Sequence, residues 1–240
     1  MFSNLEKGLY QTFVLKNNYM YFVRGIGITL LVTFFSLILG MILGIILAII
    51  RASHDQQKTG RTSPVLAVLN GIAKVYITVI RGTPTMVQLL IMWFVIWASA
   101  RATDSNMIKC AIVTFGINSG AYIAEIIRSG IMSIDAGQME AGRSLGLSYG
   151  TTMATVIIPQ AFKNILPALG NEMITLLKET SIVTVIGLKD LTKGAMIIQG
   201  NTYQAFVPFV AIAVIYLALV MLLSWLLGKL ERRLRASDHR

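Results

Sequence analysis

Long apolar runs alternate with short polar segments along the chain. A bilayer core of about 30 Å needs roughly 20 apolar residues in a helix, which satisfies its own backbone hydrogen bonds in lipid. Five runs meet or approach this length, and their predicted bounds are residues 25–50, 85–100, 107–127, 165–186 and 205–227. The pattern therefore predicts an all-α integral membrane protein, a single domain over residues 1–240 with five transmembrane helices.

The segments between these runs are expected to lie outside the bilayer. Residues 1–24 contain Lys7, Lys16 and Arg24 without a compact apolar core, which is unlike a cleavable signal peptide and favours a short external segment. The other such segments are a polar link at 51–63, a weakly apolar stretch at 64–80 expected along the membrane interface, an external connection at 187–204 and a basic cytoplasmic tail at 228–240.

Small residues recur at every fourth position of the first apolar run, at Ser36, Gly40, Gly44 and Ala48. Such a seam lets a second helix approach closely. That helix belongs either to the same chain, as ordinary internal packing, or to a neighbouring subunit.

The polar stretch at residues 133–159 carries helix signals of its own. Asp135 can cap a short helix, Gln138 completes a capping-box pattern, and Gly146 supplies the stop. A second short helix can begin near Ser148 and run to Pro159. Two short helices on a membrane loop are most simply explained as a docking surface for another protein.

Composition agrees with the membrane prediction. The chain is 55% hydrophobic and only 13% charged, against roughly 25% in a soluble domain. The net charge of +10 does not indicate nucleic acid, because the charged residues lie between the apolar runs. One cysteine, Cys110, excludes an internal disulfide, and with only His54 and His239 as imidazole ligands no metal site is visible.

The placement of Lys and Arg predicts the orientation. With the polar stretch in the cytoplasm, thirteen of the 21 Lys and Arg residues are cytoplasmic, seven are external, and Lys178 lies in the membrane. Cytoplasmic segments carry an excess of these residues. We therefore expect an external N-terminus and a cytoplasmic C-terminus.

Charges inside predicted spans need an explanation, because each costs about 2.5–3.5 kcal/mol at the centre of a spanning helix. Such charges normally face a cavity or a partner, and an amino acid zwitterion would need both donors and acceptors. Lys178 could instead form an ion pair with a carboxylate that holds two helices together. The candidate substrate-pathway residues are Asn118, Ser119, Tyr122, Glu125, Lys178, Glu179, Thr180 and Ser181, with Glu172 a further intramembrane carboxylate.

One motif resembles a phosphate-binding loop without being one. Gly137, Gly142, Arg143 and Ser144 have its spacing, but Arg143 replaces the lysine and no strand precedes the first glycine. Nucleotide binding by this chain is therefore rejected.

Glu140, Ala141, Gly142, Gly146 and Pro159 resemble the EAA loop in the membrane subunits of bacterial ABC importers. The family pattern has Ala, Ile and Leu where this chain has Gly142, Val156 and Ile158. Three further stretches resemble permeases for polar amino acids: RGTP at 81–84 followed by Val87 and Gln88, NSGAY at 118–122, and LLKETS at 176–181. The resemblance covers about residues 25–235.

The resemblance implies a permease subunit in a bacterial plasma membrane, moving polar L-amino acids by alternating access. The chain would bind no cofactor and catalyse no reaction, because ATP and Mg would be bound by a partner ATPase. The implied complex has two permease chains, as a homodimer or heterodimer, two ATPase subunits and an external substrate-binding protein. The residues expected to dock the ATPase are Asp135, Glu140, Ala141, Gly142, Arg143 and Gly146.

Two other functions are compatible with the residues. An ATP-independent channel or secondary carrier could relay ions through Glu125, Lys178 and Glu179, but it leaves the docking helices unexplained. A membrane scaffold leaves the intramembrane charges unexplained. Arginine, histidine, lysine, glutamine and cystine all fit as substrates, and the excess of carboxylates leans towards a cationic side chain.

Overall fold

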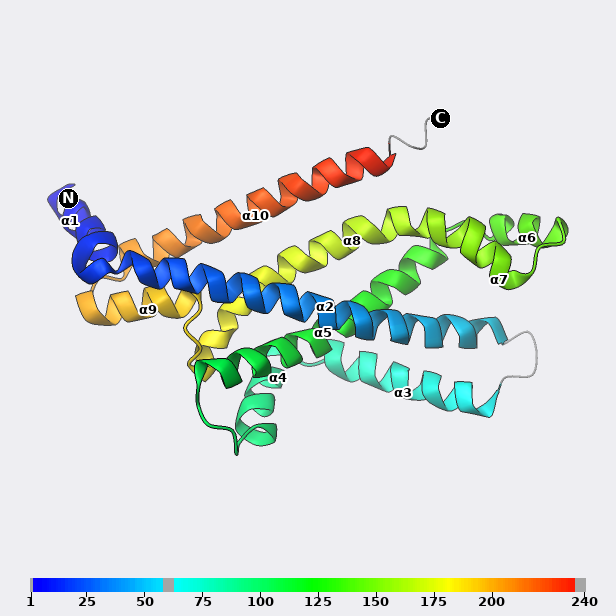
Figure 1. Cartoon of the computed structure of the whole chain (residues 1–240), viewed down its shortest axis with the longest axis horizontal. Coiled ribbons are helices and arrows are strands. Elements are labelled where there is room, and N and C mark those ends of the chain that lie inside the picture. The colour runs from blue at the N-terminus through cyan, green and yellow to red at the C-terminus, as the bar shows by residue number, and fades with distance from the viewer. Residues whose placement is uncertain (1, 58–62, 236–240) are drawn as a thin grey trace. The chain divides into compact units, whose positions relative to one another are not determined.

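A computed structural model describes residues 2–57 and 63–235, and every regular element in them is helical, which confirms the predicted all-α class (Figure 1). The α-helices are α1 (Phe2–Leu9), α2 (Tyr19–Gln57), α3 (Pro64–Arg81), α4 (Thr85–Ile91), α5 (Asp104–Met132), α6 (Ala136–Ser144), α7 (Tyr149–Thr152), α8 (Ile158–Glu179), α9 (Leu191–Thr202) and α10 (Phe206–Arg235). Wider π-helical turns span Tyr10–Val14, Met92–Ile96 and Met153–Ile157, and tighter 3-10 turns span Leu15–Asn17 and Thr180–Ile186.

Four helices among the described residues are long and apolar enough to cross a bilayer, namely Tyr19–Asp55, Pro64–Arg81, Asp104–Met132 and Phe206–Arg233. The set differs from the predicted one in two respects. Helix α3, expected along the interface, qualifies, whereas the short apolar helix Thr85–Ile96 and the polar helix α8 do not. Hydropathy measures what one helix could expose to lipid, and a helix that faces protein or a cavity can carry charges. The five predicted bounds stay predictions.

Helix ends extend beyond the predicted apolar runs. Helix α2 begins six residues before Gly25 and continues through Arg51 to Gln57, so much of the expected polar link is helical. Residues 58–62 of that link lie outside the described residues. The predicted connection at 187–204 contains α9, which Asp190 caps by accepting from the backbone N–H groups of Thr192 and Lys193. The predicted bounds were too short because hydrophobicity indicates only the part of a helix that contacts lipid. Polar residues can continue the same helix beyond the bilayer.

The chain folds as two compact units, each with its own core. One unit comprises the described residues up to Ile38 with Pro84–Phe115 and Ile174–Leu223, and the other comprises those of Leu39–Thr83 and Gly116–Met173 with the described residues from Ser224. The first core has one cluster that includes Val32, Phe115 and Leu176, and a second that includes Phe22, Leu191 and Ile212. The core of the other unit, which includes Leu39–Thr83, contains Ile77, Ala121 and Ala124.

The small-residue seam of α2 packs within the chain. A Cβ on Gly40 would lie 3.0 Å from the Ser119 Cβ of α5, and one on Gly44 would lie 2.5 Å from the Ile123 Cγ2. In the other unit, Ser36 donates to the Ile112 carbonyl oxygen. The internal-packing interpretation of the seam is therefore confirmed for these positions, because only small residues allow α2 and α5 to approach this closely.

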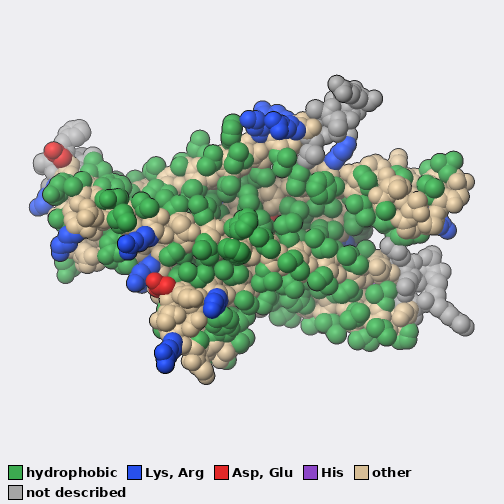
Figure 2. Space-filling model, in the orientation of Figure 1, with side chains coloured by type: hydrophobic (Ala, Val, Ile, Leu, Met, Phe, Trp, Pro, Cys, Tyr) green, Lys and Arg blue, Asp and Glu red, His purple; other side chains and the backbone are tan. Residues whose placement is uncertain are grey.

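Hydrophobic side chains cover most of the visible surface of the helices, with Lys and Arg gathered towards their ends (Figure 2). Only 28% of the most apolar window of α2 and 17% of that of α10 is buried within the chain. Large side chains such as Phe34, Ile42 and Leu217 are exposed. A surface of this kind suits lipid or other subunits rather than water.

Candidate functional site

The predicted docking loop forms a short helix with well-defined ends. The Asp135 carboxylate accepts from the Gly137 N–H at 2.7 Å and caps α6, as expected. At the other end Gly146 has a φ of +84°, which a residue without a Cβ adopts without strain. The Leu147 N–H donates to the Gly142 carbonyl and the Gly146 N–H to the Arg143 carbonyl, the two bonds of a Schellman end.

The second short helix begins as predicted but does not end as predicted. The Ser148 hydroxyl accepts from the Thr151 N–H and caps α7. The chain then passes through the π-helical turn Met153–Ile157 directly into α8, so Pro159 lies inside a continuous helical segment rather than ending it. A proline ring clashes with the carbonyl four residues earlier. Here that residue is Thr155, in the wide turn, which makes room for the ring.

Gly142 joins the two short helices. A Cβ at this position would lie 2.4 Å from the Thr152 Cγ2 of α7, and Thr152 is itself fully buried. Gly142 thus allows close packing of α6 on α7. Gly142 faces inwards, whereas Glu140, Ala141 and Arg143 are exposed.

The NSGAY stretch lies on α5, with its two polar residues buried. The Ser119 hydroxyl donates to the Glu172 carboxylate of α8 at 2.8 Å, across 53 sequence positions. Asn118 is 3% exposed and Ser119 is fully buried. A carboxylate, a hydroxyl and an amide in one unit provide donors and acceptors for a polar ligand.

Further along the same face of α5, Tyr122 and Glu125 contact arginine side chains. The Arg81 guanidinium stands over the Tyr122 ring, 5.1 Å from its centroid. The Arg51 Nη1 donates to Glu125 Oε2 at 3.0 Å, and Arg128 donates to Oε1. Glu125 is therefore neutralised by two guanidinium groups, which supports a bracing role over direct contact with a substrate.

The LLKETS stretch ends α8 in the other unit. Lys178 is exposed, and in the described part of its own unit it makes no ion pair. The Thr85 side chain of α4 hydrogen-bonds the Glu179 carboxylate. Thr180 is fully buried and donates to the Leu177 carbonyl, while Ser181 is half-buried. Lys178 interacts electrostatically with the neighbouring Glu179 carboxylate, and its structural pairing with a carboxylate of another helix stays a prediction.

The eight predicted pathway residues fall into two sets of four. Asn118, Ser119, Tyr122 and Glu125 belong to one unit, and the LLKETS residues Lys178–Ser181 belong to the other. Sequence reasoning missed Arg51 and Thr85 as partners of Glu125 and Glu179. The sequence did carry a signal for a third partner, because Glu125 and Arg128 have the i, i+3 spacing of an ion pair on one helix. It carried no such signal for Arg51 or Thr85, which lie far away in the sequence.

No group of acidic, histidine or cysteine residues within 2–57 and 63–235 could hold a metal ion. Outside the candidate spans, burial raises the pKa of Tyr149 in α7. Burial also raises the pKa of Asp190 to about 6, although its backbone hydrogen bonds act against the shift. Asp190 caps α9, and Tyr149 lines a cavity together with Asp55 and Arg128.

Comparison with known proteins gives consistent results. Residues 65–236 match the family described as binding-protein-dependent transport system inner membrane component. The chain is 43% identical to the arginine transport system permease protein ArtQ of Bacillus subtilis (strain 168), over 70% of this chain and 76% of the relative. It is 44% identical to the glutamine transport system permease protein GlnP of Escherichia coli (strain K12), over 70% and 77%.

The fold is similar to that of a solved structure described as the crystal structure of an amino acid ABC transporter with histidines. The TM-score is 0.79 at 42% sequence identity, and the match covers 90% of this chain and 94% of that chain.

Proposed function

Because the chain belongs to the family of binding-protein-dependent transport system inner membrane components, we propose that it is the permease subunit of an ATP-driven importer for polar, preferentially cationic, L-amino acids. Its family members are transport subunits, so the chain itself is not an enzyme. ATP and Mg would be bound by a separate ATPase subunit.

The main support for this proposal is the packed pair of helices α6 and α7, which offers a docking surface for an ATPase subunit. Gly142 faces α7, and Glu140 lies about 160° round the helix from it, at roughly 100° per residue, on the exposed side. Arg143 is exposed as well, and its Nη1 donates to the Leu147 carbonyl at 3.3 Å. A packed helix pair that presents a carboxylate and a guanidinium suits docking of a second protein with complementary charges.

The same geometry supports a route for coupling. Helix α7 continues through Met153–Ile157 into α8 without a break, and α8 carries Glu172, Lys178 and Glu179. A displacement of the docked helices would therefore move α8. Transport follows if ATP and substrate bind the inward-open and outward-open states with different affinity.

The proposed complex contains a second permease chain, two ATPase subunits and an external binding protein. Two permeases paired about a twofold axis would enclose a pathway that few spans enclose alone. The docking loop and the C-terminus would be cytoplasmic and the N-terminus external, as the distribution of Lys and Arg indicates.

The polar groups support an amino acid as substrate. Lys178 could serve a substrate carboxylate, and the neighbouring Glu179 of the same unit could serve an ammonium group. Glu125 is paired with two arginines, and the proposed cationic preference rests on Glu179. The relatives named for arginine and glutamine transport are in accord with a polar substrate.

Affinity purification from the native membrane in mild detergent tests the docking function. The tagged chain is compared with Glu140→Lys, which reverses the exposed charge, and with Gln138→Lys, which adds a lysine to another exposed position of the same helix. We expect an ATPase subunit to copurify with the wild type and Gln138→Lys and to be lost from Glu140→Lys. If no form brings down an ATPase, the proposal fails.

Uptake of labelled arginine tests the substrate class. Cells that express the wild-type chain should accumulate arginine, and unlabelled lysine or histidine should compete better than leucine. Glu140→Lys should abolish uptake. Equal competition by leucine would contradict the polar preference while leaving the permease assignment intact.

A further inference from the structure

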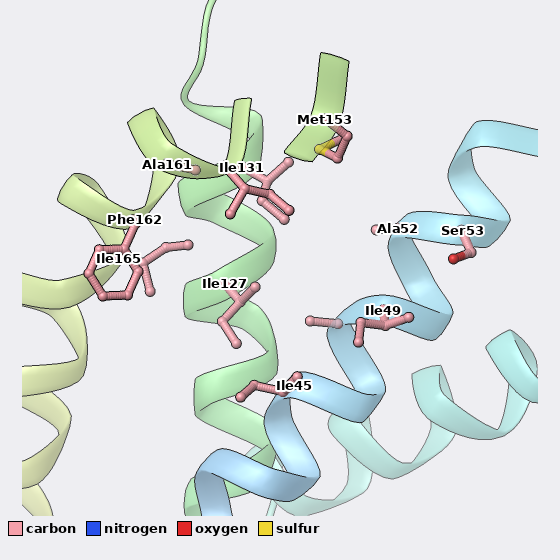
Figure 3. A pocket seen from close by; sticks show the side chains of 12 residues that line it. Ile45, Ile49, Ala52, Ser53, Ile127, Ile131, Met153, Ala161, Phe162 and Ile165 are labelled. Atoms are coloured by element: carbon pink, nitrogen blue, oxygen red, sulfur yellow. The ribbon is translucent and has the colours of Figure 1, made fainter. Parts of the chain in front are cut away.

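An apolar cavity of about 340 Å³ opens in the unit that contains the docking loop (Figure 3). Its walls come from four elements: Ile45 and Ile49 of α2, Ile127 of α5, Met153 of the π-helical turn, and Phe162 of α8. Ser53 is the one hydroxyl among the lining side chains. Since water in a cavity needs two to four polar partners, this space suits hydrocarbon better than water.

A second cavity, of about 250 Å³, lies next to the first and shares part of its lining. Ala52, Ile131 and Met153 line both. The second cavity adds Asp55, Arg128 and Tyr149 and so has charged and hydroxyl groups of its own. Together the two spaces form one amphipathic site, apolar along the membrane helices and charged at one end.

The Arg128 side chain retains donors for a ligand. Its Nε and Nη2 donate to Glu125, and Nη1 donates to the Met132 sulfur, a weak acceptor. A guanidinium has five N–H donors and three are used here, so two remain for a ligand. Arginine binds phosphate oxygens through charge-assisted hydrogen bonds.

We propose that this amphipathic site binds a membrane phospholipid, with an acyl chain in the apolar cavity and the phosphate at Arg128. Two of the wall-forming helices, α2 and α5, are long and apolar enough to cross the bilayer, so lipid reaches the cavity directly. The bound lipid would touch Met153, in the turn between α7 and α8.

Photocrosslinking of the unmodified protein tests the site without any variant. The purified protein is placed in vesicles of phosphatidylethanolamine that contain a small fraction of the same lipid with a diazirine in its acyl chain. Crosslinked peptides are then identified by mass spectrometry. We expect enrichment at residues 45–53, 127–131 and 158–165 over the equally apolar surface of α10. Even labelling of α10 and these segments would overturn the proposal.

A cavity-filling variant gives a second, quantitative test. Ala52→Phe places a ring where the two cavities meet, and Ala213→Phe places the same ring on the exposed surface of α10. Phospholipid retained per chain after detergent purification is measured by mass spectrometry. We expect Ala52→Phe to lose most of the lipid retained by the wild type and by Ala213→Phe. Equal retention in all three overturns the site, whether or not the chain proves to be an amino acid permease.

Discussion

Arg51 of α2 and Glu125 of α5 form a hydrogen-bonded ion pair across 74 sequence positions. The Arg51 Nη1 lies 3.0 Å from Glu125 Oε2, and the two side chains are 16% and 23% exposed. Arg128 binds the other carboxylate oxygen from the next turn of α5. One carboxylate thus ties the end of α2 to α5, within the unit that contains the docking loop.

Glu125→Gln is expected to destabilise the protein. Hydrogen bonds to charged groups contribute about 1.5–3 kcal/mol, and the variant leaves two guanidinium groups without their carboxylate. The free energy of unfolding is measured by denaturation in detergent micelles. The exposed Glu140→Gln is the matched control and should stay within about 0.5 kcal/mol of wild type.

A double-mutant cycle with Arg51→Met isolates the pair. Coupling energies of residues in contact are about 0.5–3 kcal/mol, so the double variant should be less destabilised than the two single changes added together. Strict additivity would show that Arg51 and Glu125 do not interact in the membrane.

Gly142→Ala should separate α6 from α7. The new Cβ would lie 2.4 Å from Thr152, whose hydroxyl also donates to the Ser148 carbonyl and holds its rotamer. Overpacking of this kind costs about 1–3 kcal/mol. We expect faster trypsin cleavage after Arg143 and weaker copurification of the ATPase subunit.

Gly150→Ala provides the comparison, because a Cβ there meets no atom within 4 Å. Alanine in place of an exposed helical glycine should leave docking unchanged or slightly stabilise α7. If both variants lost ATPase copurification to a similar extent, the cause would be the replacement of a loop glycine in general. The α6–α7 contact would then not explain the loss.

Lys178→Met should abolish substrate-stimulated ATP hydrolysis by the assembled complex while leaving the amount of complex unchanged. Lys178 is exposed and makes no ion pair in the described part of its own unit, so its removal orphans no carboxylate there. Lys189→Met, at another exposed lysine, is the control and should retain the stimulation. Loss of the Lys178→Met protein from the membrane would instead favour structural pairing with a partner.

Asp190 predicts a pH dependence of stability. Burial raises its pKa from 3.8 to about 6, so between these values the folded state binds more protons than the unfolded state. Stability should therefore decrease as the pH rises from about 4 to about 6, by up to about 3 kcal/mol at 1.36 kcal/mol per pKa unit.

Asp190→Asn should remove this dependence and keep part of the cap of α9, because the single asparagine oxygen can accept one of the two N–H groups that the two Asp190 oxygens accept from Thr192 and Lys193. Melting temperatures between pH 4 and 7 provide the measurement, with Asp104→Asn at an exposed position as control. An unchanged slope in Asp190→Asn would assign the dependence to another group.

The sequence by itself determined the features that depend on neighbouring residues. Apolar runs identify membrane helices because lipid contact depends on local hydrophobicity. Asp135, Ser148 and Gly146 mark helix ends because caps and left-handed turns involve groups within a few residues. For the same reason the all-helical class and the presence of two short helices in the loop were predictable.

Only the tertiary structure decided which side chains meet. The contacts of Arg51 with Glu125, of Ser119 with Glu172 and of Gly142 with Thr152 depend on how helices pack and rotate against one another. Local spacing does not encode that rotation, since it follows from the fit of side chains over whole helix faces. Packing therefore showed that Glu125 pairs with Arg51 and that Gly142 faces α7, two contacts that the motifs alone did not reveal.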